Sequence, residues 1–515
     1  MLFNSIVFIF GFLPVTLAGY WLLAATGRHR PRLIWLAAAS LFFYGYWAPR
    51  YVLLLVGAMA VNYVLAAALQ RSPPDAARRR RYVLTLGVLF NVGLLFYFKY
   101  FNFFINNVNA LTGEHIMIAR IALPLAISFF TFQKIALLFD IYRGKVTLGP
   151  VTEYATFVLF FPQLIAGPIV HYSELAPQLA TRPRLNDATR NILIGLVIFA
   201  IGLFKKTVLA DSAALYATPL FDAVGDGTRL DLVSAWLGAA SYTLQIYFDF
   251  SGYSDMAIGL ARMFGVLLPL NFHSPLRSGN MAELWRRWHM TLSRFVMSYI
   301  FQPISMPLAR FAAERFRRPW AFLAVSTLAP TFLSMIIIGA WHGAAWNFFI
   351  FGAMHGSYVA AYEAWSFFMK KRRKKKPQGR GSIAFAHLLT VLCFIAAVVP
   401  FRAANVHVTG EFFAAMLGVN GIVGGWSGMV PLGAGGMLTA LAIGWLIVFF
   451  LPNTQQFMTR AEPALEWSKW VKVGPPRFWI RWQPTLGWAI VAGAFLFFGI
   501  AFIMRGSPVF LYFNF

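Results

Sequence analysis

The chain has 515 residues, of which 59% are hydrophobic, 17% aromatic and only 12% charged, and its formal net charge is +26. This composition excludes an ordinary soluble domain and indicates a protein that crosses a membrane many times. The positive charge lies between the apolar runs, so orientation in the membrane explains it better than nucleic-acid binding. The single cysteine, Cys393, excludes an internal disulfide framework and a cysteine-based zinc site.

Twelve apolar segments have about the length that a membrane-spanning helix needs. They are 1–23, 33–47, 51–69, 82–98, 120–140, 189–213, 233–258, 320–341, 345–367, 383–400, 433–452 and 484–505. The first lacks a basic start and is soon followed by a second, so we expect a retained helix and not a signal peptide. Since alternating strands are absent, a β-barrel is not expected. We predict an all-α polytopic fold of about 11–12 spans, with re-entrant and amphipathic interfacial helices, in one domain over residues 1–515.

The charged segments between the spans predict how the helices are oriented. Basic clusters should face the cytoplasm, where they also meet anionic lipid. These clusters are 28–32, 71–81, 286–318, 370–376 (within the basic loop 370–380) and 469–481. With the N-terminus outside, all of them fall inside. The Asn-rich loop 102–118, the acidic loop 214–232 and the C-terminus then fall outside.

Two further segments do not form simple spans. Phe157–Val170 is apolar but is interrupted by Pro162, Gly167 and Pro168. We expect a broken or re-entrant segment, which is tolerated only when it is buried in protein or lines a cavity. Residues 402–432 are rich in glycine and predict a loop with a short surface helix. No internal repeat is evident, which counts against many transporter folds.

An amphipathic helix is predicted over residues 281–299, because apolar residues recur there at helical spacing. It belongs to a cytoplasmic-side element over about 277–318. His289 falls on the apolar face of this helix and should point into the protein. The alternative for His289 is an interfacial histidine among lipid headgroups.

His342 is the leading candidate for chemistry. It lies inside Trp320–Met369, a stretch with one charged residue, Glu363. Ionisable groups at membrane depth usually mark a pathway or a reaction centre, and histidine can take and return a proton near neutral pH. The alternative is an interfacial histidine satisfied by a backbone carbonyl. Its neighbours favour a site: Gly343 permits close approach, Trp341 and Trp346 can wall a narrow tunnel, and Asn347 supplies an amide.

Three other titratable residues are candidates for a role beside His289 and His342. His355 follows His342 by about 220° on an ideal helix, so we expect it to pack or hydrogen-bond. Asp249 and Asp255 flank a Ser251-Gly252 pair that suggests a helix break; they either tie broken helices together or orient a catalytic histidine. No histidine pair has the spacing of a metal site with acidic support, so no metal is assigned. No nucleophile-elbow serine or phosphate loop is present, which favours general-base catalysis between two bound substrates.

Taken together, several blocks resemble the membrane-bound O-acyltransferase (MBOAT) family, and most closely its bacterial alginate O-acetyltransferase branch. The blocks are Phe160–Pro168, Tyr247–Asp255, Trp285–Ser293, Trp341-His342-Gly343 with His355-Gly356, and Ser507-Pro508 with Leu511–Phe515. Each block alone is weak, but their order and spacing are specific, and the resemblance covers nearly the whole chain.

The resemblance implies an O-acyltransferase in which tilted helices surround a thin centre with funnels from both faces. The position of His342 matches the family's catalytic histidine and that of His289 its second histidine. A cytosolic donor such as acetyl-CoA, with no tightly bound cofactor, would acetylate an exopolysaccharide such as alginate, beside a periplasmic acetyltransferase partner. The location implied is the bacterial inner membrane. Donor phosphates could be attracted by Arg286, Arg287 and Arg294.

Three alternatives remain at this point. The first is a transporter or flippase with His342 in a proton relay. The second is a non-catalytic scaffold of a polysaccharide secretion complex. The third is a D-alanyl transferase of the same family, which would take its acyl group from a carrier protein.

Overall fold

The computed structural model describes residues 1–117, 121–165, 167–373 and 379–504. Within these ranges the fold is helical, and the only β-type pairing is an isolated bridge between Pro269 and Leu465. Of the predicted basic loop 370–380, residues 374–378 lie outside the described residues, while α18 reaches Arg373 and α19 begins at Arg380. The block Ser507-Pro508 with Leu511–Phe515 lies entirely outside them.

The helices fall into three consecutive groups. The first group is α1 (Leu13–Ala25), α2 (His29–Trp47), α3 (Val52–Arg71), α4 (Ala77–Leu95), α5 (Phe101–Thr112), α6 (Ile127–Tyr142), α7 (Val151–Leu159), α8 (Phe161–Leu164) and α9 (Tyr172–Ala180). The second is α10 (Ala188–Phe204), α11 (Asp211–Gly225), α12 (Leu232–Met263), α13 (Met281–Arg287), α14 (Met290–Val296), α15 (Gln302–Arg315), α16 (Pro319–Leu323), α17 (Ala329–His342) and α18 (Trp346–Arg373). The third is α19 (Arg380–Ala397), α20 (Val399–Arg402), α21 (Val406–Met416), α22 (Gly433–Phe450), α23 (Thr454–Phe457) and α24 (Leu486–Ile503).

Several of these helices are joined by π-helical turns, which widen the helix locally and are frequent at functional sites. The π-helical segments are Val7–Phe12, Phe96–Tyr100, Lys205–Ala210 (η5), Met297–Phe301 and Ala324–Leu328. Short 3-10 turns are Pro49–Tyr51, Leu185–Asp187, Pro275–Arg277, Trp426–Met429, Thr459–Ala461 and Trp467–Lys469.

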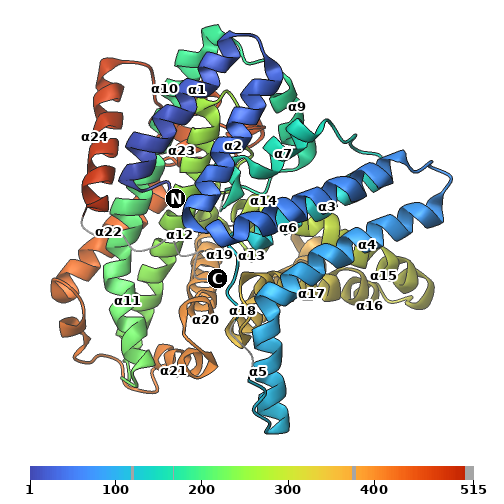
Figure 1. The fold of residues 1–515 in the computed structure, drawn as a ribbon. Coiled ribbons are helices and arrows are strands. Elements are labelled where there is room, and N and C mark those ends of the chain that lie inside the picture. Colours follow the sequence, from blue (N-terminus) through green and yellow to red (C-terminus); the bar gives the residue numbers. More distant parts are fainter. Residues whose placement is uncertain (118–120, 166, 374–378, 505–515) are drawn as a thin grey trace.

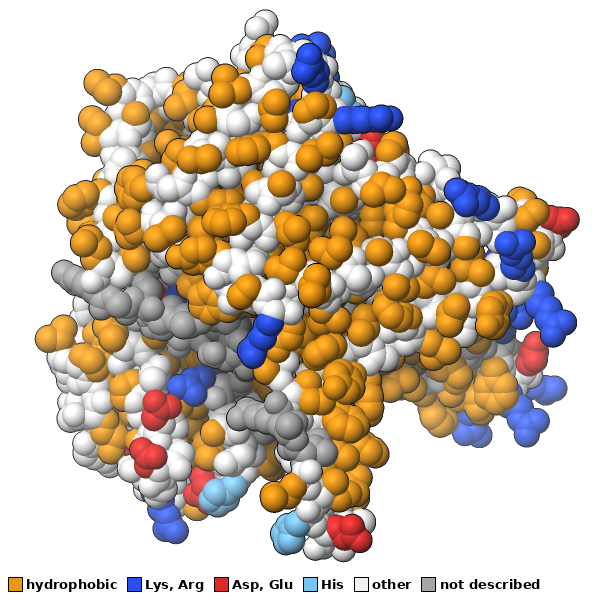
Figure 2. Space-filling view, in the orientation of Figure 1, with side chains coloured by type: hydrophobic (Ala, Val, Ile, Leu, Met, Phe, Trp, Pro, Cys, Tyr) orange, Lys and Arg blue, Asp and Glu red, His pale blue; other side chains and the backbone are white. Residues whose placement is uncertain are grey.

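Eight helical stretches in the described ranges are long and apolar enough to cross a bilayer, by length and composition alone. They are Val7–Ala25, Pro49–Arg71, Ala77–Thr112, Leu185–Gly225, Pro319–His342, Arg380–Arg402, Gly433–Phe450 and Leu486–Ile503. The other four predicted spans are also helical, as α2, α6, α12 and α18. Figure 2 shows a surface dominated by hydrophobic side chains, with Lys and Arg gathered mainly toward the upper and right-hand edges.

The central helix is α12, which is buried along most of its length and packs against α10, α11 and α22 (Figure 1). The helix break expected at Ser251-Gly252 is wrong, because α12 runs unbroken through this pair. The glycine serves close packing instead. A Cβ on Gly252 would lie 2.7 Å from the carbonyl oxygen of Gly202 on α10, so α10 and α12 approach closely at this point.

The loops expected at 102–118 and 214–232 are also largely wrong, since α5 and α11 occupy most of them. In α5 the asparagines do not break the helix. The Asn107 amide donates back to the Phe103 carbonyl at 2.7 Å, and Thr112 donates to Val108 at 2.9 Å. Such local bonds let polar residues remain in an exposed helix. Figure 1 shows α5 projecting from the lower side of the molecule.

Two irregular segments match the expectation. Helix α7 ends at Leu159, and the chain continues through Phe160 and the short helix α8 as a buried, broken segment. Residues 402–432 contain the short helix α21 and otherwise loop and turn. By contrast, the helix predicted over 281–299 is interrupted: α13 ends at Arg287 and α14 begins at Met290.

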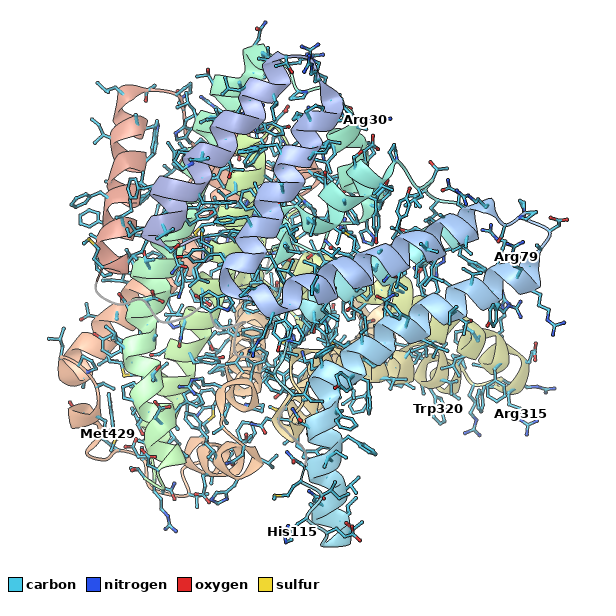
Figure 3. The ribbon with its side chains drawn as sticks, in the orientation of Figure 1. Arg30, Arg79, His115, Arg315, Trp320 and Met429 are labelled. Carbon is cyan, nitrogen blue, oxygen red and sulfur yellow. The ribbon has the colours of Figure 1, made fainter. Side chains whose placement is uncertain are left out.

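The positions of the loops agree with the predicted orientation. Figure 3 shows Arg30, Arg79 and Arg315, from three clusters expected inside, along the upper and right-hand side of the molecule. His115, from the Asn-rich segment expected outside, lies at the lower side. A bilayer between these two sets of loops would leave the basic segments on one face, as the charge distribution requires.

Candidate active site

His342 is the last residue of α17 and is buried. The chain turns at Gly343 into α18, so α17 and α18 form a tight hairpin. A Cβ on Gly339 would lie 2.1 Å from the Phe348 carbonyl oxygen, and a Cβ on Gly343 would overlap the Phe348 ring at 2.0 Å. These glycines therefore permit the close approach that the sequence predicted for this segment. The His342 ring contacts the rings of Phe351 and Phe401 at centroid distances of 5.6 and 5.1 Å.

His289 occupies the break between α13 and α14 and is fully buried, as predicted from its place on the apolar face. Its backbone is left-handed, with φ of 43°, a strained conformation for a non-glycine residue. The neighbouring segment 271–273 holds this turn through backbone hydrogen bonds. The Met290 N–H donates to the Asn271 carbonyl at 2.9 Å, and the His273 N–H donates to the Arg287 carbonyl at 3.0 Å. Strain held by surrounding structure is typical of functional positions.

The tautomer of His289 follows from its partner. Asn271 Oδ1 accepts from the Thr291 hydroxyl at 2.9 Å and from the Thr291 backbone N–H at 3.4 Å, so this atom is the amide oxygen. It lies 3.0 Å from His289 Nδ1, which therefore carries the proton. The lone pair is thus on Nε2. Burial lowers the pKa of His289 to about 3, so the neutral imidazole persists at neutral pH.

His355 joins the same cluster, although it lies on α18. Both His342 and His355 pack against Phe351, at 5.6 and 4.5 Å between ring centroids. The break after α17 brings together two residues that would lie on different faces of a continuous helix. Trp285 of α13 donates its indole N–H to His355 Nδ1 at 3.2 Å, which confirms a hydrogen-bonding role. The proton of this neutral ring is therefore on Nε2, a buried atom with no hydrogen-bond partner among the described residues.

Lys99 is a functional candidate that the sequence analysis missed. It lies in the π-helical segment Phe96–Tyr100, and its ammonium donates to the Trp341 carbonyl and, at 3.2 Å, to the His342 carbonyl. Both carbonyls lie at the C-terminal end of α17, where the helix dipole favours a cation. A lysine within the apolar run Phe96–Phe101 is itself a signal of a buried partner, and that signal could have been read from the sequence.

The cluster is walled by aromatic rings and contains several titratable side chains. Trp341 is buried and stacks on Phe132 at 5.5 Å, and its ring lies 6.0 Å from that of His289. His289, Lys99 and His355 all lie close enough to interact electrostatically with the His342 imidazole. His289 and His342, which were predicted to act together, are therefore brought to one place, and His355 of α18 joins them.

Asp249 and Asp255 are held by lysines. Asp249 pairs with Lys206 at 2.9 Å, and Lys206 also pairs with Asp211 at 2.7 Å. Asp255 pairs with Lys205 at 2.8 Å and accepts from Thr454 at 2.6 Å. The two carboxylates therefore have the structural role of joining helices that the sequence suggested. They join α12 to η5 and to α23, and α12 itself is unbroken.

Two other predicted neighbours of His342 lie elsewhere. The Asn347 amide donates to the Ala403 carbonyl at 2.6 Å and so fastens α18 to the segment after α20. Trp346 does not wall the site: its side chain is 55% exposed and donates to Asn107 of α5 at 2.9 Å. Trp346 and Asn347 hold the hairpin in place, whereas Trp341 lines the site.

The three arginines proposed for donor binding differ in their partners. Arg287 is buried and paired with Glu283. Arg294 is paired with Glu174, at 2.5 and 2.9 Å. Arg286 is exposed. Two of the three cations are therefore already neutralised by carboxylates, and Arg286 is the one best placed to meet a donor phosphate.

No group of three or more His, Cys, Asp or Glu side chains that could hold a metal ion occurs in the described ranges. The cluster itself can supply proton transfer by imidazole, hydrogen bonding by N–H groups and exclusion of water by aromatic rings.

Sequence comparisons identify the proteins that this chain is similar to. The sequence model of the membrane-bound O-acyltransferase family matches residues 145–400, which include His289, His342 and His355. A peptidoglycan O-acetyltransferase from Helicobacter pylori is 40% identical over 449 residues, covering 82% of this chain and 81% of that protein. A probable alginate O-acetylase from Pseudomonas putida is 32% identical over 524 residues, with full coverage of both chains. A teichoic acid D-alanyltransferase from Bacillus subtilis is 28% identical over 277 residues, covering 52% of this chain and 67% of that protein.

The chain therefore belongs to the membrane-bound O-acyltransferase family. Within it, the chain lies in the bacterial branch of the alginate type. It is a multi-pass membrane protein and an O-acyltransferase.

Proposed function

We propose that this O-acyltransferase uses His342 as the general base for acetyl transfer to a hydroxyl of a cell-surface polysaccharide. The observation that carries the proposal is the buried histidine cluster, in which His342 meets His289 and His355 inside aromatic walls. An imidazole buried among aromatic rings is suited to take a proton from a hydroxyl and return it.

The proposed reaction balances without a covalent enzyme intermediate. His342 takes the proton of the acceptor hydroxyl as the oxygen attacks the thioester carbonyl carbon, forming a C–O bond. The C–S bond then breaks, and the leaving thiolate takes the proton from the His342 imidazolium. The ester and the free thiol are the products, and the imidazole is neutral again.

Two neighbouring groups fit the charges that develop in this reaction. The negative charge on the former carbonyl oxygen needs N–H donors, and the unpartnered Nε2–H of His355 is such a donor. His289 presents a neutral ring with its lone pair on Nε2, held by Asn271. It can accept a hydrogen bond from the acceptor hydroxyl or from a water, and so help to orient the nucleophile.

The donor, the partner and the location are part of the same proposal. We infer acetyl-CoA as the donor, approaching from the cytoplasmic side where Arg286 is exposed. The relatives named for alginate and peptidoglycan acetylation support acetyl and a polysaccharide acceptor. A periplasmic acetyltransferase partner and a place in the bacterial inner membrane complete the scheme.

The test is thioester cleavage by the full-length protein reconstituted in vesicles with radiolabelled acetyl-CoA outside and an oligosaccharide acceptor inside. Wild type should release CoA and acetylate the oligosaccharide, whereas His342→Ala should do neither. Arg286→Gln should raise the acetyl-CoA concentration needed for half-maximal rate. Acetyl transfer that persists in His342→Ala would refute the role of His342. Transfer only from a D-alanyl carrier protein would replace the donor.

A further inference from the structure

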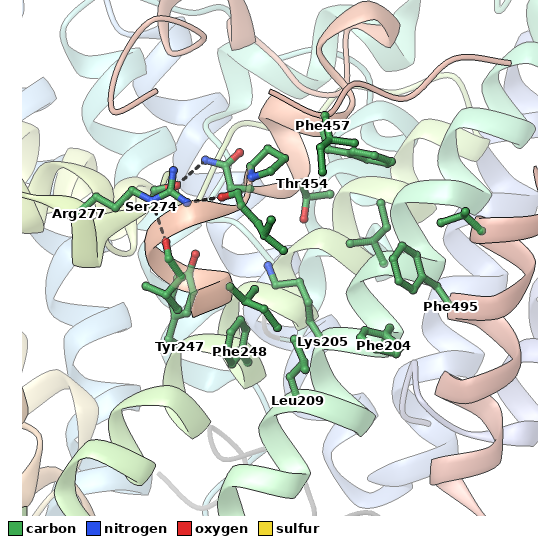
Figure 4. A pocket seen from close by; sticks show the side chains of 18 of the residues that line it. Phe204, Lys205, Leu209, Tyr247, Phe248, Ser274, Arg277, Thr454, Phe457 and Phe495 are labelled. Carbon is green, nitrogen blue, oxygen red and sulfur yellow. Dashed lines mark hydrogen bonds between the residues drawn. The ribbon is translucent and has the colours of Figure 1, made fainter. Parts of the chain in front are cut away.

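A cavity that is partly open to the surface lies outside the histidine cluster, at the flank formed by α10, η5, α12, α22, α23 and α24 (Figure 4). Its volume is about 330 Å³, within the usual range of ligand pockets. The outermost helix, α24, packs on α10 and η5, while α22 packs on α12. The cavity, hereafter the flank cavity, is left between these two pairs.

The flank cavity has an apolar body and a cationic end. Phe204, Val491 and Phe495 line the body. Figure 4 shows Arg277 at the end opposite Phe495, with Lys205 between them. An apolar slot with cationic groups at one end fits an amphiphile with an anionic head.

The two cations differ in how far they are neutralised. Lys205 is paired with Asp255 at 2.8 Å. Arg277 donates to the carbonyls of Val448 and Leu451 at the end of α22, and no carboxylate among the described residues lies within 4.0 Å of it. Its Nη1 has no hydrogen-bond partner in that same part of the chain. Arg277 is therefore a cation whose charge is left uncompensated.

The rim beside this end is also cationic. Ile480 lines the cavity, and the segment 467–485 around it carries the exposed residues Lys472, Arg477 and Arg481 but no acidic residue. Aromatic side chains accompany them, and Arg481 lies over the Trp479 ring at 4.8 Å. Mixed basic and aromatic residues are typical of a segment at the surface of an anionic leaflet.

The cavity faces the bilayer and not the histidine cluster. Among the described residues of α24, only Gly499 is buried, so this helix lies at the lipid-facing surface of the protein. On the other side, Tyr247 and Phe248 of α12 close the cavity, and the Tyr247 ring meets Trp288 at 6.3 Å, beside His289. A substrate for His342 would have to pass this wall, whereas a lipid could enter between α22 and α24.

We propose that the flank cavity binds an anionic phospholipid of the cytoplasmic leaflet. One acyl chain lies along Phe204, Val491 and Phe495, and the phosphate lies beside Arg277 and the basic rim. This site does not depend on the acyl-transfer chemistry proposed above, because it shares no residue with the histidine cluster.

The experiment is native mass spectrometry of the full-length protein taken from vesicles of equal phosphatidylglycerol and phosphatidylethanolamine. Wild type should retain phosphatidylglycerol over phosphatidylethanolamine by about fivefold or more, the preference that one added cationic contact gives. Val491→Trp fills the cavity and should abolish retention. Ile490→Trp is the matched control, since Ile490 is the preceding residue, is 65% exposed and does not line the cavity.

Two further variants test the apolar body and the cationic end of the cavity separately. Ile447→Trp fills the same cavity from α22 and should reproduce the loss if Val491→Trp fails to fold. Arg277→Gln should keep lipid in the cavity but remove the preference for phosphatidylglycerol. Retention unchanged in both tryptophan variants, equal retention of the two lipids by wild type, or displacement of the lipid by CoA would each overturn the proposal.

Discussion

Two of the buried polar clusters in the described part of this apolar protein are built on opposite principles. In the first, Asp249 and Asp255 meet Lys206 and Lys205, so each charge has a countercharge within 3 Å. In the second, His342, His289 and His355 gather among aromatic rings, and the side chains that act electrostatically on His342 are His289, Lys99 and His355. The comparison shows that a buried ionisable residue is not in itself a functional signal. What distinguishes the site is a group such as the buried His355 Nε2–H, which has no hydrogen-bond partner among the described residues.

The largest expected effect concerns the ion-pair cluster. Asp249→Asn removes one of the carboxylates paired with Lys206 and should lower the free energy of unfolding by about 3–5 kcal/mol, the usual cost of breaking a buried pair. Thermal unfolding of the purified protein measures the loss. Acyl transfer per folded molecule should be unchanged. Asp75→Asn, at an exposed position, is the control and should alter neither quantity.

The second prediction reverses this pattern in the histidine cluster. His355→Phe keeps a ring against Phe351 but removes the Nε2–H, and should lower kcat by about 10²- to 10³-fold with little loss of stability. Trp285→Phe removes only the donor to Nδ1 and should have a smaller effect on kcat. If His355→Phe instead unfolds the protein and leaves the turnover of the folded fraction intact, the contrast between the clusters fails.

A smaller effect is expected at the residue that orients His289. Asn271→Ala removes the acceptor of the His289 Nδ1 proton, worth about a tenfold loss in kcat/KM for one hydrogen bond. Ser254→Ala removes another partner of Asn271 while keeping the acceptor in place, and should cost less. Equal losses in both variants would show that Asn271 serves packing and not the tautomer of His289.

The smallest effect is the pH dependence of the segment 451–485. His273 donates from Nε2 to the Val473 carbonyl at 2.8 Å, and its Nδ1 accepts from Asn453 at 3.3 Å, so the neutral ring is fully used. Burial lowers its pKa from 6.5 to about 4. When residues 451–485 pack against His273, the protein therefore binds fewer protons between pH 4 and 6.5 than when this segment is detached. The packed state is destabilised as pH falls from 6.5 toward 4.

Hydrogen exchange of residues 451–485 between pH 7.5 and 5 measures this weakening. Protection should decrease on acidification in wild type after correction for intrinsic rates. His273→Asn, which does not titrate, should show a flat profile. A wild-type profile as flat as that of the variant would exclude His273 as the titrating group.

Much of this organisation could be predicted from the sequence, because long apolar runs and basic loops are local features. The all-α fold and the burial of His289 follow from them. The helices α5 and α11 were missed, since asparagine and acidic residues in them suggested loops. Their polar side chains bond back to the helix or lie exposed, which composition alone does not reveal.

The finer geometry of the site depended on tertiary contacts that one sequence does not encode. The left-handed turn at His289 is fixed by Asn271 and Thr291, and His355 reaches His342 only because the chain breaks at Gly343. The lysine partners of Asp249 and Asp255 were visible as Lys205 and Lys206 within an apolar span, and pairing them would have predicted the structural role.

The most direct test of the central claim compares the two clusters in one experiment. Acetyl ester on the secreted polysaccharide is measured in cells carrying wild type, His342→Gln or Asp249→Asn, and divided by the amount of folded protein in the membrane. The account predicts a loss of about 10²- to 10⁴-fold for His342→Gln, with the polymer still exported, and a value near wild type for Asp249→Asn. Wild-type acetylation per folded molecule in His342→Gln would contradict it.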